Sequence, residues 1–137
     1  MPKIFLIIFI FFTTFSVSAE TVQKIELIGN DRFSIETIKV YGDIELNKDY
    51  SDFDINNILK NLYETEFFED IKISLNNNVL KITVQEYPVI NSVTLKGEKS
   101  IQLTKKILES LNLKSKKSYI ENQLTEDISK IKKIYAS

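Results

Sequence analysis

The sequence contains no cysteine and no histidine among its 137 residues. Without cysteine there is no disulfide, no thiolate metal site and no cysteine nucleophile. Without histidine the usual catalytic triads and proton shuttles are excluded as well. Carboxylates and lysines remain for chemistry, but their spacing alone places no two of them in a common cleft. We therefore expect neither an enzyme nor a bound cofactor.

Glycine and proline are also scarce, at three and two residues, which argues against a linker-like or disordered chain. The 18 basic and 19 acidic residues nearly balance, and the lysines are scattered, so no nucleic acid is expected as a partner. Hydrophobic residues make up 43% of the chain and are sufficient for real cores. The composition is typical of a folded chain that is stabilised by packing.

The first 19 residues differ from everything that follows. Lys3 supplies a basic start, residues 4–12 form an unbroken apolar run, and small residues precede Glu20. This pattern is typical of a signal peptide, so we predict that residues 1–19 are removed between Ala19 and Glu20. The alternative is a retained membrane anchor, but a spanning helix needs about 20 mostly apolar residues. Export without disulfides is compatible with a bacterial periplasm.

After this segment, hydrophobic periodicity predicts a β-α-α-β-β unit. Its strongest signal is a helix that Ser51 can cap, with Asp54 three residues on and an apolar stripe behind it. Because both later strands alternate apolar with polar residues, the two helices must pack on one face of a three-stranded sheet. The expected elements are a strand over residues 22–28, a helix from Ser34 to Gly42, a helix after Ser51 that ends near Phe67 and Phe68, and a hairpin of strands 71–75 and 80–84.

The same order of elements then starts again. Residues 89–97 repeat the pattern of a strand followed by glycine, and helical patterns follow after Ile101 and after Ser118, which forms a capping-box pattern with Glu121. The sequence thus predicts an α+β tandem repeat. Residues 20–88 form the first module, and residues 89–137 form an incomplete second module, truncated before its closing hairpin and poorly stable alone.

Three stretches of the sequence resemble a known family. Residues 22–34, 59–71 and 84–91 are similar to the first POTRA module of the BamA family, outer-membrane protein assembly factors, and to its linkage into the second module. The resemblance therefore implies tandem POTRA modules. One departure is Glu66, which stands where the family usually has a glycine that supplies a positive φ.

The resemblance also implies a function. It suggests a POTRA region at the periplasmic side of the cell outer membrane, which receives unfolded outer-membrane proteins, docks accessory lipoproteins and helps its clients fold and insert as β-barrels. Membrane contact would come through a barrel that is absent from these residues. The alternatives are a free-standing periplasmic protein-binding module, the POTRA region of a related autotransporter-assembly or two-partner secretion transporter, and a division protein with one POTRA module.

Two stretches are candidate sites. In the POTRA arrangement the strand after the helices lies at a sheet edge, where its backbone can pair with an extended client of any sequence. The alternative is that Lys72, which points outward on that strand, prevents pairing at the edge. The second candidate is the inter-module junction, where Pro88 stiffens the chain, either as an ordinary linker or to hold the modules in one orientation. The edge strand is Ile71, Lys72, Ile73, Ser74 and Leu75, and the junction is Glu86, Tyr87, Pro88, Val89, Ile90 and Asn91.

Overall fold

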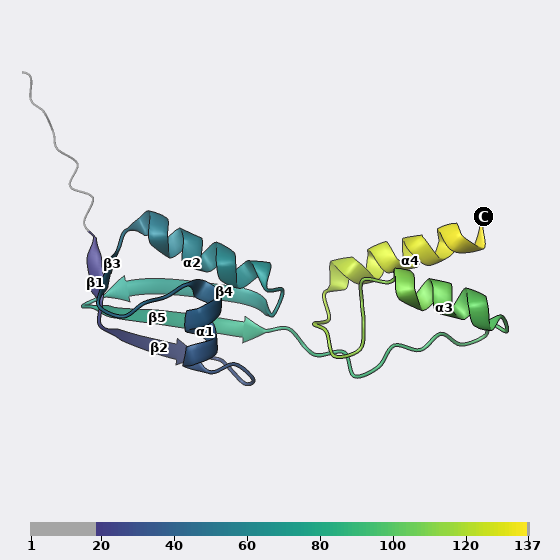
Figure 1. Ribbon diagram of the computed structural model, residues 1–137, viewed down its shortest axis with the longest axis horizontal. Coiled ribbons are helices and arrows are strands. Elements are labelled where there is room, and N and C mark those ends of the chain that lie inside the picture. The colour runs from purple at the N-terminus through teal and green to yellow at the C-terminus, as the bar shows by residue number, and fades with distance from the viewer. Residues whose placement is uncertain (1–18, 137) are drawn as a thin grey trace, which may run out of the picture.

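The computed structural model describes residues 19–136, which form two modules one after the other (Figure 1). The predicted signal peptide, residues 1–19, lies outside the described residues except for Ala19. None of the helices within residues 19–136 has the length and apolar character needed to cross a membrane.

The first module contains two sheets. β1 (Glu20–Val22) pairs antiparallel with β3 (Lys48–Tyr50), a pairing that the sequence did not predict. β2 (Lys24–Ile28), β4 (Phe68–Asn76) and β5 (Val79–Glu86) form a three-stranded sheet in the order β2-β5-β4. The central strand β5 runs parallel to β2 and antiparallel to β4. The predicted hairpin is confirmed, and the predicted edge strand 71–75 lies within β4 at one border of the sheet.

The two helices of the first module begin where capping residues predict them. α1 (Ile35–Gly42) starts after Ser34, whose hydroxyl accepts a hydrogen bond from the Thr37 amide, 3.2 Å away. α2 (Asp52–Glu64) starts with the predicted capping box, in which Ser51 and Asp54 each accept a hydrogen bond from the other's backbone amide. Both helices lie on the same face of the sheet (Figure 1), as the alternation of the strands requires.

One hydrophobic core holds this module together. The Phe68 side chain is almost fully buried, and its neighbour Phe67 stacks on Phe33 with 4.7 Å between ring centroids. The two phenylalanines therefore anchor the end of α2 on the sheet. The largest fully buried side chains of the first module are Phe68, Ile38, Leu62, Leu80, Ile82 and Val22.

The second module consists of α3 (Ile101–Ser110), α4 (Glu121–Tyr135) and an extended segment before them. The strand predicted over residues 89–97 was wrong, because the described residues supply no ladder for it. Only an isolated bridge between Val89 and Ser118 forms. An extended segment is a strand only where a neighbour accepts and donates its backbone hydrogen bonds.

The capping box predicted for the last helix was also wrong. α4 begins only at Glu121, after Ile120, and no side chain caps it. Ser118 instead lies opposite Val89 in the isolated bridge, and the Tyr119 amide donates to the Pro88 carbonyl at 2.7 Å. This pairing keeps the chain extended beyond Ser118, so that the serine is too early to act as the N-cap.

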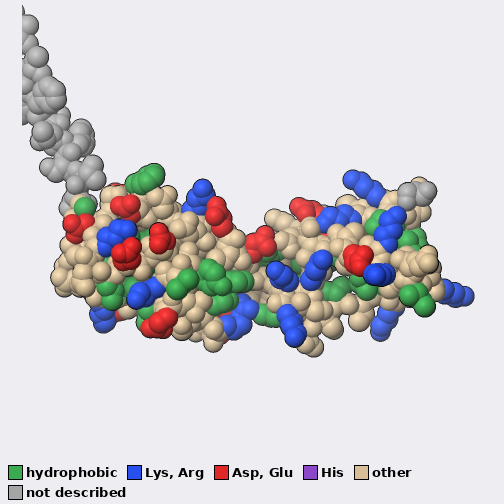
Figure 2. Space-filling view, in the orientation of Figure 1, with side chains coloured by type: hydrophobic (Ala, Val, Ile, Leu, Met, Phe, Trp, Pro, Cys, Tyr) green, Lys and Arg blue, Asp and Glu red, His purple; other side chains and the backbone are tan. Residues whose placement is uncertain are grey.

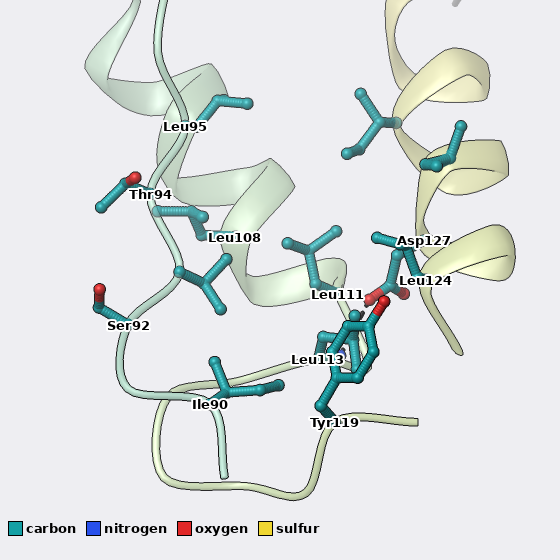
Figure 3. A pocket seen from close by; sticks show the side chains of 13 residues that line it. Ile90, Ser92, Thr94, Leu95, Leu108, Leu111, Leu113, Tyr119, Leu124 and Asp127 are labelled. Atoms are coloured by element: carbon teal, nitrogen blue, oxygen red, sulfur yellow. Dashed lines mark hydrogen bonds between the residues drawn. The ribbon is translucent and has the colours of Figure 1, made fainter. Parts of the chain in front are cut away.

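An apolar groove runs between the extended segment and the two helices of the second module (Figure 3). Its volume is about 440 Å³, and Leu124 and Ile128 of α4 line it while remaining 38% and 45% exposed. The apolar side of α4 is therefore partly open. In the first module the corresponding helices are covered by the three-stranded sheet.

Candidate functional site

The predicted edge strand has an apolar and a polar face. Ile71 is 5% exposed, and Ile73 and Leu75 pack partly buried against the core. Lys72 and Ser74 lie between them on the opposite face and are exposed. Side chains that alternate in this way stand above and below the sheet, so the backbone of β4 itself forms the border.

Two contacts show which backbone groups of β4 point outward. The Ile71 amide donates to the hydroxyl of Tyr63 on α2, 3.0 Å away, and so faces away from β5. Val84, the partner of Ile71 on β5, turns its carbonyl to the opposite side, where a Cβ on Gly29 would collide with it. In an antiparallel ladder both backbone groups of one residue point to the same side, and the side alternates along the strand.

The same alternation shows to which side the backbone groups of the other edge residues point. Ile71, Ile73 and Leu75 direct their backbone N–H and C=O groups to the open edge, the side of β4 that faces away from β5. Lys72 and Ser74 direct theirs toward β5, where they lie opposite Thr83 and Lys81. Within residues 19–136, no hydrogen bond outside the sheet engages the amides of Ile73 and Leu75. The edge thus offers unpaired donors and acceptors two residues apart.

Tyr63 is the residue of this site that the sequence did not reveal. It falls at the end of the apolar stripe of α2, a pattern that predicts a core position, yet its side chain is 40% exposed. Its hydroxyl reaches the border of the sheet because α2 packs directly over β4. A tyrosine at the end of a stripe is the signal that could have identified it, since its polar tip seeks a partner.

The first half of the junction is tied to the first module by Glu86. Its side chain accepts hydrogen bonds from the amides of Asp31 and Arg32, at 2.9 and 3.0 Å, and from the Arg32 guanidinium at 2.6 Å. Arg32 also donates to the Tyr87 carbonyl at 3.0 Å. Burial alone would raise the pKa of Glu86, but these hydrogen bonds and the positive charge outweigh it and hold the pKa below its usual value.

The rest of the junction is bonded on both sides. The Tyr87 amide donates to the Phe67 carbonyl of the first module at 2.9 Å. The Ile90 amide donates to the Lys117 carbonyl of the second module at the same distance. Val89 forms the isolated bridge, whereas Asn91 is exposed. The backbone of the junction is therefore hydrogen-bonded to both modules, although a role in holding their orientation stays a prediction.

Glu66 lies where the two modules meet. Its φ of 57° is positive, which agrees with the glycine that the related family has at this position. Its carboxylate accepts from Gln123 of α4 at 3.4 Å. Both residues line a polar cavity of about 300 Å³ to which Arg32 and Lys117 also contribute.

A buried carboxylate holds the second module together. Asp127 of α4 is 2% exposed and accepts the amides of Asn112 and Leu113, at 2.8 to 2.9 Å, together with the Lys130 ammonium at 3.2 Å. Burial is the largest single influence and by itself would raise the pKa of Asp127. The backbone hydrogen bonds and Lys130 together outweigh it and keep the pKa below its usual value. The carboxylate thus joins α4 to the loop after α3.

The surface carries mixed charge. On the face that Figure 2 shows, acidic and basic side chains are interspersed over both modules. Within residues 19–136, no three acidic side chains are grouped in a way that could hold a metal ion.

No protein-family model matches this chain. Three curated relatives carry the name outer membrane protein assembly factor BamA, and two of them match over most of this chain. The one from Neisseria meningitidis serogroup B is 31% identical over 117 residues, which cover 84% of this chain and 15% of that protein. The one from Buchnera aphidicola subsp. Acyrthosiphon pisum is 30% identical over 134 residues, which cover 92% of this chain and 22% of that protein. The chain thus spans less than a quarter of the length of either relative.

Solved structures share the fold. The N-terminal domain of Omp85 from Thermosynechococcus elongatus superposes with a TM-score of 0.58 at 15% identity, over 87% of this chain and 52% of that one. POTRA modules 1 and 2 of Omp85 from Anabaena superpose with a TM-score of 0.54 at 12% identity, over 88% of this chain and 81% of that one. The α+β architecture is therefore that of tandem POTRA modules.

Proposed function

Because this chain is a POTRA-bearing relative of the BamA assembly factors, we propose that it forms the periplasmic part of an outer-membrane protein assembly factor. In this role it receives unfolded outer-membrane proteins and presents them for folding and insertion. The first module takes up extended client segments at the open edge of β4. Docking of accessory lipoproteins, which the family resemblance implies, belongs to the same proposal.

One observation carries the proposal: the outward backbone groups of Ile73 and Leu75 have no partner within the described chain outside the sheet. A client strand that adds to this edge satisfies them whatever its side chains are. Such indifference to sequence suits a receptor for many clients. Ile73 and Leu75 leave a partly exposed apolar border, which favours clients with alternating apolar residues.

The competing interpretation, an edge protected against pairing, depends on the charge of Lys72. Its side chain is 77% exposed, but its ammonium lies 3.2 Å from the Asp70 carboxylate, so the pair carries no net charge. A neutral pair repels an incoming strand less than a single lysine does. A free-standing binding module would use the same edge, and it differs from the assembly factor only in the protein that surrounds it.

Proline at Ile73 tests the edge. The substitution Ile73→Pro removes one outward amide, a change that an edge strand tolerates because that amide makes no ladder bond. We expect crosslinking of a photoreactive peptide with alternating apolar residues to fall by about 2- to 10-fold, the equivalent of one hydrogen bond. The control is Ile73→Ala, which loses the same side chain and keeps the amide. Equal crosslinking of the two variants would refute uptake at this edge.

We also propose that a β-hairpin of the longer protein covers the apolar groove of the second module. In the first module the sheet that contains the β4-β5 hairpin covers the equivalent helices, with α2 on β4 and α1 on β2. The groove residues Leu124 and Ile128 are more exposed than core residues of such size usually are. The matched residues make up only 15% and 22% of the two relatives, so each relative contains much additional chain, more than a hairpin requires.

The substitution Ile128→Lys tests this cover. In the chain of 137 residues it should change the free energy of unfolding by less than about 0.5 kcal/mol, because the position is exposed. In a longer chain that includes the hairpin, the same lysine is buried without a partner and should cost about 3 kcal/mol or more. Urea unfolding followed by circular dichroism measures both values. An equally small effect in the longer chain would argue that nothing covers the groove.

A further inference from the structure

The hydroxyl of Tyr63 occupies a position that a neighbouring strand would otherwise use. It accepts the Ile71 amide at 3.0 Å, and hydrogen bonds between strands place a carbonyl oxygen at nearly this distance from the same donor. Two acceptors cannot take one place in line with a single N–H. A strand can therefore pair at Ile71 only if the tyrosine moves away.

We propose that Tyr63 determines where pairing along the open edge begins. With the tyrosine in place, an added strand meets the outward groups of Ile73 and Leu75 and finds the Ile71 amide already satisfied. The opposite end of β4 is closed by the turn at Asn77 and Asn78, which leads directly into β5. The edge is thus a short window, bounded by the tyrosine at one end and the turn at the other. This inference rests on the proposed uptake of strands at β4.

The window has a consequence for the ligands that fit it. A bound segment pairs through the backbone groups of only two residues, so that extended segments of about five residues suffice. Longer strands gain nothing at the start of β4 unless they displace the tyrosine. The ring is 40% exposed, so it can turn outward without opening the core.

Tyr63 therefore acts as a specificity residue for short, weakly held segments. A receptor that passes its clients on needs each contact to be reversible, and a short window keeps the number of hydrogen bonds low. Removing the hydroxyl extends the window by one residue pair. The ring and its packing on α2 remain when the residue is phenylalanine.

The test compares Tyr63→Phe with Tyr41→Phe. Tyr41 is similarly exposed at 43%, and within residues 19–136 no hydrogen bond of its hydroxyl is found. In Tyr63→Phe we expect the Ile71 amide to exchange hydrogen about 2- to 10-fold faster in the free chain, because its acceptor is gone. We expect a nine-residue alternating peptide to bind tighter by a similar factor, measured by fluorescence anisotropy. Tyr41→Phe should change neither quantity.

Two results separate this inference from the proposed function. If Ile73→Pro weakens the peptide and Tyr63→Phe does not tighten it, strands do add at the edge and the role of Tyr63 is overturned. If Ile73→Pro leaves binding unchanged, uptake at β4 fails, and the inference about Tyr63 fails with it. Faster exchange at Ile71 together with tighter binding supports both.

Discussion

The substitution Gly29→Ala is expected to destabilise the first module by about 3 kcal/mol. Gly29 follows β2 with a φ of +80°, a conformation that residues with a Cβ rarely adopt. A Cβ at this position would also collide with the backbone carbonyl of Val84, which cannot move aside because it belongs to the central strand. Either the end of β2 or the sheet itself must shift.

The chain contains a matched control for this substitution. Gly97 stands at the equivalent point of the second repeat with a φ of +94°, but no atom lies within 4 Å of a Cβ placed there. Gly97→Ala should therefore cost only the conformational strain, about 1 kcal/mol. Amide hydrogen exchange of β5 and of α4 reports the two modules separately. Similar losses in the two variants would show that the contact with Val84 is unimportant.

The substitution Asp127→Asn should destabilise the second module by about 2 to 3 kcal/mol. The carboxylate accepts hydrogen bonds from the Asn112 amide, the Leu113 amide and the Lys130 ammonium. An asparagine side chain has only one oxygen, so its NH₂ group must face at least one of these donors. The control is Glu126→Gln, since this neighbouring carboxylate is exposed and, within residues 19–136, accepts a hydrogen bond only from the Asn112 side chain. We expect urea to unfold α3 and α4 of Asp127→Asn at clearly lower concentration, as measured by circular dichroism.

The pH dependence of the stability of the second module also tests how much the Asp127 carboxylate contributes to it. Because the pKa of Asp127 is lower in the folded chain than its ordinary value of 3.8, the unfolded chain binds the proton more tightly. The stabilisation is fully present above that value and is lost as the pH falls through it toward the folded pKa. The stability of Asp127→Asn should lack this acid-dependent loss. If the unsubstituted chain and Asp127→Asn lose the same stability in acid, groups other than Asp127 cause the loss.

Local signals in the sequence accounted for the elements that depend on neighbours along the chain. Ser34 and Ser51 cap helices because their side chains reach amides two or three residues ahead. The turn at Asn77 and Asn78 follows from two residues that tolerate positive φ. Where a distant partner competed, the same reasoning failed: Ser118 has the pattern of a capping box, but its pairing with Val89 keeps it out of the helix.

The candidate site shows the same division. Alternating residues predicted the hairpin, and the family resemblance placed strand 71–75 at the edge. The sequence could not show which amides of that strand point outward, because a shift of one residue in the pairing with β5 would exchange the two sets. The register, seen in the contact of Val84 with Gly29, decides it.

By itself, the sequence determined the repeat, the helices and the hairpin of the first module, and the absence of thiol and imidazole chemistry. All of these depend on composition or on residues a few positions apart. Only the tertiary structure decided that Tyr63 reaches the open edge, that Asp127 is buried, and that the second module leaves its groove open. These features arise where elements distant in sequence pack together, and hydrophobic periodicity carries no information about such contacts.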